Sequence, residues 1–247
     1  QPVLFAHHVL AYFEMLGRDA ERLRQAYARA DVMSLGSGAL AGVPYAIDRE
    51  YVARELGFSS LSANSMDAVS DRDFMLDFHS AAATCMVHMS RLAEEMVLWS
   101  TAEFGFLRLA GEYTTGSSMM PQKRNPDYAE LARGRTGRVF GHLMALLTVL
   151  KGLPLTYNRD LQEDKEGFFD TFDTLVSTLS AMTGMVASME LDRERLGQAA
   201  GDGAMLATDL ADYLVARGMP FREAHGVVAR ISAEAQEQGT GLHELPL

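Results

Sequence analysis

The segment 114–130, TTGSSMMPQKRNPDYAE, gathers side chains that could transfer a proton. Two serine hydroxyls follow a glycine, and a lysine and an asparagine precede a helical pattern. A serine hydroxyl acts as a base only where neighbouring groups stabilise its alkoxide. Lys123, loop N–H groups and the N-terminus of a helix beginning near Pro126 are candidates for that role. The same donors could hold a substrate carboxylate, or the dianion formed when the carbon beside it loses a proton.

Asn125 and Glu130 complete this candidate set. Asn125 adds a directional donor and is expected to cap the helix, with Pro126 in its first turn. Glu130 lies five residues beyond this cap, close enough to orient a catalytic group at the mouth of the helix. Taken singly, a Gly-Ser-Ser triplet is usually a linker, a Lys-Arg pair is usually solvated, and methionines usually pack. Their ordered occurrence before a long helix favours a functional loop.

Composition limits the class of protein. The chain has 247 residues, 48% of them hydrophobic and 22% charged, which is ordinary for a globular protein with a sizeable core. No apolar run is long enough to cross a bilayer. The net charge of −11 argues against a nucleic-acid partner. Residues 121–165 nevertheless carry a local balance of +3, which suits capture of a small anion, although scatter of charge over solvated helix faces is the alternative.

Cys85 is the only cysteine, so no intrachain disulfide can form. Its position in a helical pattern predicts a buried small hydrophobe in a reducing compartment. The seven histidines show no ligand spacing with cysteines or carboxylates, and we therefore predict no metal site.

The hydrophobic pattern predicts an all-α fold, a long-helix bundle. Helices are expected over residues 2–29, 48–57, 70–110, 126–151, 165–190, 207–217 and 221–238, with breaks at 36–44 and 64–70. A helix of about forty residues would span roughly 60 Å and needs partners along its length, which indicates a bundle. We place a boundary near Gly197, giving a central helical-bundle domain (1–196) and part of a smaller C-terminal helical domain (197–247).

Three glycines recur on one face of the helix expected over 126–151: Gly134, Gly137 and Gly141. Each costs about 1 kcal/mol relative to alanine inside a helix. Their spacing predicts close approach of another backbone or of a ligand.

The loop motif GSSMMPQKRNPDYAE resembles the signature of the fumarase/aspartase superfamily, with eight fixed positions in order. Members of that superfamily are all-α homotetramers that reversibly eliminate a group from a succinyl skeleton and release fumarate. The MPQK form of the loop and the segment YNRDLQEDKE resemble argininosuccinate lyases in particular. The segments GSGALAG and ADYLVARGMPFREAH do so as well, and the resemblance therefore covers essentially the whole chain.

This resemblance implies roles for particular residues. Ser117 would be the general base that takes the Cβ proton of argininosuccinate. Lys123 and Asn125 would hold the fumarate-side carboxylates and the aci-carboxylate intermediate. Glu130 would orient a catalytic histidine. The positions implied to bind substrate also include Ser118, Tyr157, Gln162 and Lys165. The loop is expected to close over the substrate.

The resemblance further implies a cytoplasmic homotetramer whose active sites are shared between subunits, with a small-molecule substrate and no cofactor. Relative to the family pattern, the chain begins a few residues after the stretch that carries the catalytic histidine, and it also stops early. We therefore expect it to be truncated at both ends. None of His7, His8 and His79 matches that histidine.

Two alternatives stay open. One is a catalytically silent, crystallin-like structural protein, which the missing histidine favours and the intact Ser117 loop opposes. The other is a superfamily lyase that acts on another succinyl adduct, such as adenylosuccinate.

Overall fold

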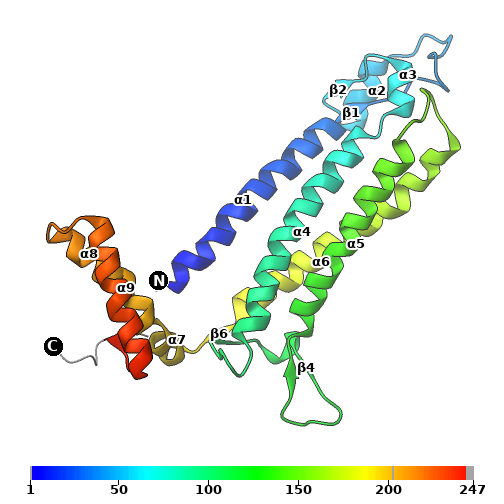
Figure 1. Cartoon of the computed structure of the whole chain (residues 1–247). Coiled ribbons are helices and arrows are strands. Elements are labelled where there is room, and N and C mark those ends of the chain that lie inside the picture. Colours follow the sequence, from blue (N-terminus) through cyan, green and yellow to red (C-terminus); the bar gives the residue numbers. More distant parts are fainter. Residues whose placement is uncertain (1, 202, 243–247) are drawn as a thin grey trace. The chain divides into compact units, whose positions relative to one another are not determined.

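The computed structural model describes residues 2–201 and 203–242, and α-helices dominate it (Figure 1). The helices are α1 (Phe5–Ala30), α2 (Arg49–Leu56), α3 (Ser65–Ser70), α4 (Asp73–Trp99), α5 (Asp127–Leu150), α6 (Asp164–Ser188), α7 (Arg193–Ala200), α8 (Ala207–Ala216) and α9 (Phe221–Gln238). Short 3-10 helices are η1 (Gly111–Tyr113), η2 (Arg159–Glu163) and η3 (Gly203–Leu206). The predicted all-α fold class is confirmed.

The strands in the described residues are two-residue bridges. They are β1 (Val32–Met33), β2 (Ser60–Leu61), β3 (Leu107–Arg108), β4 (Thr115–Gly116), β5 (Arg124–Asn125) and β6 (Glu190–Leu191). Strand β1 pairs with β2 in parallel, whereas β3–β6 and β4–β5 are antiparallel pairs.

The chain divides into two compact units. One comprises residues 12–100 and 109–189, and the other comprises residues 1–11, 101–108 and 190–247. The boundary expected near Gly197 falls inside α7, so the assignment of domains 1–196 and 197–247 stays a prediction. The larger unit contains every candidate site residue.

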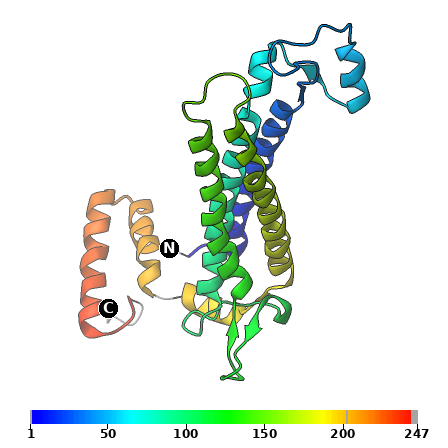
Figure 2. The same ribbon diagram turned by 90° about the vertical axis from the view of Figure 1, so that its right-hand side faces the viewer.

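Helix α4 forms the centre of the larger unit, packed along α5 and α6 (Figures 1 and 2). Its buried side chains are Met75, His79, Ala81, Ala82, Ala83, Cys85, Met86, Met89, Leu92, Ala93 and Met96. The alanines let neighbouring helices approach closely, while the methionines fill the irregular spaces between them. Each fully buried methionine contributes about 1.5–3 kcal/mol. Cys85 is buried, as predicted, and this burial raises the pKa of its thiol to about 12.

The helix expected over residues 70–110 is shorter than predicted. Helix α4 has 27 residues and ends at Trp99. The chain then turns through Gly105, whose φ of +60° lies in the left-handed region that favours glycine. The expected break at 64–70 is also wrong, because α3 forms there and Asn64 caps it by accepting hydrogen bonds from the Met66 and Asp67 backbone N–H groups.

The predicted ends of α2 are confirmed, whereas the predicted start of α5 is not. Asp48 caps α2, accepting a hydrogen bond from the Tyr51 N–H at 2.8 Å, and Gly57 ends that helix with a φ of +80°, as expected. The predicted cap of α5 is wrong. The N-cap position belongs to Pro126, which has no side chain that could accept a bond, and Asn125 lies in strand β5.

No described part of this chain approaches the glycine face of α5, so the predicted approach of another backbone or of a ligand stays a prediction. A Cβ built at Gly134, Gly137 or Gly141 would meet no described atom within 4 Å. Close approach occurs on α6 instead, where Gly167 faces the ring of His142 and Gly184 faces Tyr113.

None of the described helices is both long enough and apolar enough to span a membrane.

His79 is the largest buried titratable group of α4. Its side chain is 1% exposed, and its Nδ1 has no hydrogen-bond partner among the described residues. The ring of Phe168 packs edge-on against it, with the ring centroids 5.8 Å apart. Loss of solvent, and secondly the nearby His142, lower the pKa of His79 to about 4.

This burial predicts a pH-dependent stability. The unfolded chain protonates a histidine near pH 6.5, whereas folded His79 resists protonation until about pH 4, so stability falls as the pH drops through that window and is retained above it. Between pH 7 and pH 5, His79 should account for a loss of about 2 kcal/mol. Urea unfolding of the wild type and of His79→Leu at both pH values would measure it.

Substitution of the exposed His225 by alanine is the control and should leave the pH dependence unchanged. An identical pH dependence in the wild type and in His79→Leu would contradict the assignment.

Candidate functional site

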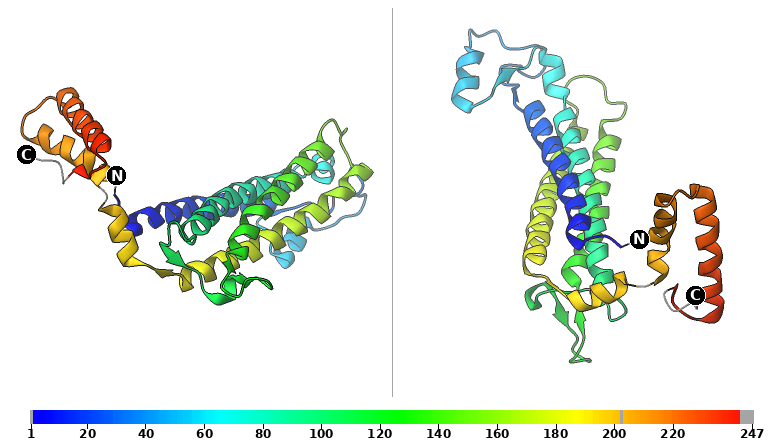
Figure 3. Two further views of the ribbon diagram at one scale, coloured as in Figure 1. Left: turned by 60° about the horizontal axis from the view of Figure 1, so that its bottom comes forward. Right: turned by 90° about the vertical axis from the view of Figure 1, so that its left-hand side faces the viewer.

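Strands β4 and β5 form a small hairpin at the start of α5, and the seven residues 117–123 between them form its tip. We call residues 117–123 the flap. Thr115 pairs with Asn125 and Gly116 with Arg124 in this hairpin. It projects beyond the ends of α4 and α5 (Figures 2 and 3). The Thr115 hydroxyl donates a hydrogen bond to the Asp127 carboxylate, which ties the hairpin to the first residue of α5.

Ser117 is the first residue of the flap, and its hydroxyl oxygen is held inside a tight turn. The oxygen accepts hydrogen bonds from the Met119 and Met120 backbone N–H groups, each at 3.2 Å. Donors of this kind favour negative charge on the oxygen they contact. The loop N–H groups that could stabilise an alkoxide are thus those of Met119 and Met120, and the role of Ser117 as a base stays a prediction.

The remaining predicted residues of this region gather around the hairpin. Ser118 and Lys123 are exposed, and Asn125 is half-buried. Glu130 is exposed in the first turn of α5. Met119, at the tip, leaves 89% of its surface in contact with solvent. The geometry thus brings Ser117, Ser118, Lys123, Asn125 and Glu130 together at one end of α5.

Three of the eight cations in residues 121–165 form ion pairs with acids of the same chain. Arg133 pairs with Glu94, and Arg138 pairs with Asp170. Lys165 lies 2.8 Å from Asp164. In contrast, neither Lys123 nor Arg124 makes an ion pair with any described residue, so the exposed hairpin carries two adjacent unpaired cations.

The other three predicted residues lie at the opposite end of α5. Tyr157 follows the turn after α5, Gln162 belongs to η2, and Lys165 lies in the first turn of α6. Tyr157 is 47% exposed.

Thr156, the neighbour of Tyr157, has a φ of +79°, a left-handed conformation that a β-branched residue rarely adopts. Such backbone strain costs about 1–3 kcal/mol and is often found at functional sites.

Asp164 is a functional candidate that sequence reasoning missed. Its side chain is almost fully buried, contacts the Arg72 Nε at 2.5 Å and accepts a hydrogen bond from Lys165 Nζ at 2.8 Å. Asp164 therefore fixes the direction of the Lys165 ammonium. The run EDKE looked like a solvated helix start, and no local signal distinguished its buried acid from its exposed ones.

A cavity of about 800 Å³ lies beside Tyr157. Its wall includes Arg72 and the loop that carries Gly36, Gly38 and Gly42, all with positive φ. A Cβ at Gly38 would lie 2.5 Å from the Gly42 carbonyl oxygen, so only glycine fits there. Three glycines within the seven residues 36–42 are the sequence signal for this wall, although the sequence analysis predicts only a break in the helices there.

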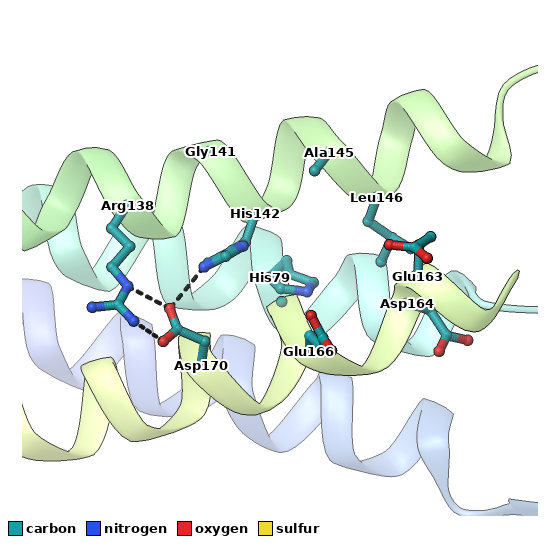
Figure 4. A pocket seen from close by; sticks show the side chains of 11 residues that line it. His79, Arg138, Gly141, His142, Ala145, Leu146, Glu163, Asp164, Glu166 and Asp170 are labelled. Atoms are coloured by element: carbon teal, nitrogen blue, oxygen red, sulfur yellow. Dashed lines mark hydrogen bonds and ion pairs between the residues drawn. The ribbon is translucent and has the colours of Figure 1, made fainter. Parts of the chain in front are cut away.

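A second cavity, of about 540 Å³, opens between α4, α5 and α6 (Figure 4). Asp170 lies toward one side of it, 2.6 Å from the Arg138 Nε and 2.7 Å from the His142 Nε2. Arg138 and His142 lower the pKa of Asp170. The Asp170 carboxylate is thus fully committed to these partners, and the cavity lining includes none of the predicted site residues.

The two groups of predicted residues stand far apart in one chain. Helix α5 has 24 residues and is therefore about 36 Å long, with the flap at its beginning and Tyr157, Gln162 and Lys165 just after its end. A single small substrate cannot touch both groups of one chain. Within the described residues, no set of three or more histidines, cysteines or carboxylates is placed to hold a metal ion.

Comparison with known proteins identifies relatives of this chain among the lyases. A family model described as lyase matches residues 1–141, and a model described as argininosuccinate lyase C-terminal matches residues 204–247. The argininosuccinate lyase of Dehalococcoides mccartyi is 60% identical over all 247 residues, which correspond to 54% of its own length. The chain thus spans about half the length of the curated relatives it matches.

Solved structures show the same fold. The crystal structure of an EDDS lyase in complex with formate superposes with a TM-score of 0.92 at 34% identity, covering 97% of this chain and 48% of that one. A class II fumarase from Schistosoma mansoni, at 17% identity, has a TM-score of 0.81 over 97% of this chain and 53% of its own, and supports the fold alone. Since the lyase model matches more than half of the chain's residues, the chain belongs to the lyase family, and its curated relatives are argininosuccinate lyases.

Proposed function

We propose that the chain supplies the flap and several substrate-binding segments of an argininosuccinate lyase, which splits argininosuccinate into arginine and fumarate. One observation carries this proposal: the Ser117 hydroxyl oxygen receives two backbone N–H bonds at the start of an exposed loop. An oxygen in that setting can bear the charge of an alkoxide and act as a general base.

The charges of the hairpin suit the substrate. Argininosuccinate carries three carboxylates, and the cations of Lys123 and Arg124 have no ion-pair partner among the described residues. Closure of the flap over the substrate would exclude water and strengthen these interactions. The small-molecule substrate needs no cofactor, because its own carboxylate activates the neighbouring C–H bond.

The reaction starts with transfer of the Cβ proton to the Ser117 oxygen. The C–H electron pair moves into the adjacent carboxylate and forms the aci-carboxylate. Lys123 and Asn125 hold this group and stabilise it more than the ground state, which lowers the barrier. The Cα–N bond then breaks, the carbon–carbon double bond of fumarate forms, and the guanidino nitrogen leaves with the bonding electrons and takes up a proton.

Glu130 serves this reaction indirectly. It is exposed in the first turn of α5, at the mouth of the helix. We assign it the orientation of a catalytic histidine that reaches the site from another segment of the assembled enzyme. Ser118 contributes a further hydroxyl to substrate binding.

A shared active site explains why the predicted residues separate. The length of α5 supports a site in which the flap of one subunit meets Tyr157, Gln162 and Lys165 of another. Asp164 holds Lys165 in position for this encounter. We propose a cytoplasmic homotetramer that acts in arginine biosynthesis, with residues 1–196 in its central bundle domain and 197–247 in its C-terminal domain.

Substitution of Ser117 by alanine should remove the base. In the complete, assembled enzyme, fumarate release is expected to fall by about 10²–10⁴-fold, with helical content and assembly unchanged. Fumarate absorbance and circular dichroism measure the two properties. The matched control is Ser180→Ala on the exposed surface of α6, which should keep full activity. A Ser117→Ala enzyme with wild-type turnover would refute the proposed base.

Sharing of sites predicts recovery of activity in mixed oligomers. Ser117→Ala and Lys165→Ala enzymes should each be inactive alone. If each site takes its flap and its Lys165 from different chains, random reassembly of an equal mixture restores about one quarter of the sites. Fumarate release after unfolding and refolding together reports the recovery. No recovery, in tetramers shown to be mixed by mass, would place both residues in one chain's site.

A further inference from the structure

Tyr113 connects the flap hairpin to the body of the bundle. It ends η1 and stands two residues before strand β4. Its phenol end lies directly on the backbone of α6 at Gly184. A Cβ built at Gly184 would lie 1.8 Å from the Tyr113 Oη and 2.4 Å from its Cζ. Real atoms never approach so closely, so the missing side chain of Gly184 creates the seat that the tyrosine occupies.

A second contact holds Tyr113 from the side of α5. Its ring meets the ring of Tyr128 edge-on, with the centroids 5.5 Å apart and the planes at 85°. Such aromatic pairs contribute about 0.5–1.5 kcal/mol beyond the area they bury. Tyr128 is the second residue of α5, so Tyr113 is held between the beginning of α5 and the later part of α6.

The backbone between Tyr113 and Ser117 is short, so the anchored tyrosine restricts the position of Ser117. The Tyr113 N–H bonds to the Ala110 carbonyl at 3.0 Å, which closes the η1 turn. Only three residues, 114–116, lie between Tyr113 and Ser117 along the incoming strand. The described structure gives the flap itself no comparable apolar contact, since residues 118–123 are all exposed.

We infer that Tyr113 and Gly184 are positioning residues for Ser117. The contact between Tyr113 and Gly184 fixes the base of the hairpin on α6. It therefore determines the position of the Ser117 hydroxyl when the flap closes. The catalytic meaning of this anchor rests on the function proposed for Ser117, whereas the anchor itself is a property of the chain and can be tested without turnover.

Limited trypsin digestion of the folded chain tests the anchor directly. Lys123 and Arg124 place cleavage sites in the hairpin, and Lys151, in the turn after α5, provides an internal reference. In Gly184→Ala the added methyl displaces Tyr113, and cleavage at the hairpin is expected to rise severalfold relative to cleavage at Lys151. The matched control is Gly197→Ala in α7, where a Cβ meets open space and both rates should stay unchanged.

The Tyr113→Ala variant distinguishes loss of the contact between Tyr113 and Gly184 from a general destabilisation of α6. Tyr113→Ala loosens the hairpin by removing the ring, without crowding the helix. The double variant Tyr113→Ala/Gly184→Ala should show the same hairpin cleavage as Tyr113→Ala alone, and its thermal midpoint should be no lower, because no ring remains to be displaced. An equal effect of Gly184→Ala in both backgrounds would overturn the proposed contact, as would a hairpin cleavage rate in Gly184→Ala equal to that of the wild type.

Kinetics of the complete enzyme decide the positioning role. Gly184→Ala should lower kcat about tenfold or more with little change in KM, since misplacing a reacting group weakens the transition state more than substrate binding. An unchanged kcat together with faster hairpin cleavage would overturn the positioning role. A wild-type enzyme that releases no fumarate would instead count against the proposed function, and the trypsin result would still decide the anchor.

Discussion

Burial of α4 between its neighbours is the constraint on which the rest of the larger unit depends. Its alanine-rich faces bring α5 and α6 close, and its methionines fill the remaining space. Because these helices lie side by side over most of their length, the residues at their ends are carried on rigid supports. A flap can move at such an end while the chemistry it serves stays aligned. His79, which has no charged partner among the described residues of this core, is held there in neutral form at neutral pH.

The length of α5 then determines how an active site can be built. The hairpin and the turn that carries Tyr157 stand at its two ends, too far apart to meet in one copy. The charges follow the same division. Arg133 and Arg138 of α5 are paired with acids of the same chain, whereas Lys123 and Arg124 of the hairpin have no such partner among the described residues. The bundle is thus stabilised by paired charges, and two adjacent unpaired cations stand on the exposed hairpin.

Features with a local cause could be predicted from the sequence, and features with a tertiary cause could not. Asp48 and Gly57 delimit α2 because a cap and a left-handed residue act within one turn. The flap could be found from its motif, and its N–H donors from the general chemistry of loops. Asn125 failed as a cap because it is needed in the hairpin, a pairing that depends on residues ten positions earlier. Asp164 and Gly184 were missed since their roles come from Arg72 and Tyr113, which are distant in sequence.

Thr156 holds a left-handed backbone immediately before Tyr157, and the folded chain gives up free energy to keep it there. Glycine adopts such a conformation without that cost, as Gly152 does in the same connection. The stiff, β-branched Thr156 therefore restricts the backbone before Tyr157 at the expense of stability. Replacing Thr156 by glycine would be expected to relieve the strain and to leave Tyr157 less firmly oriented.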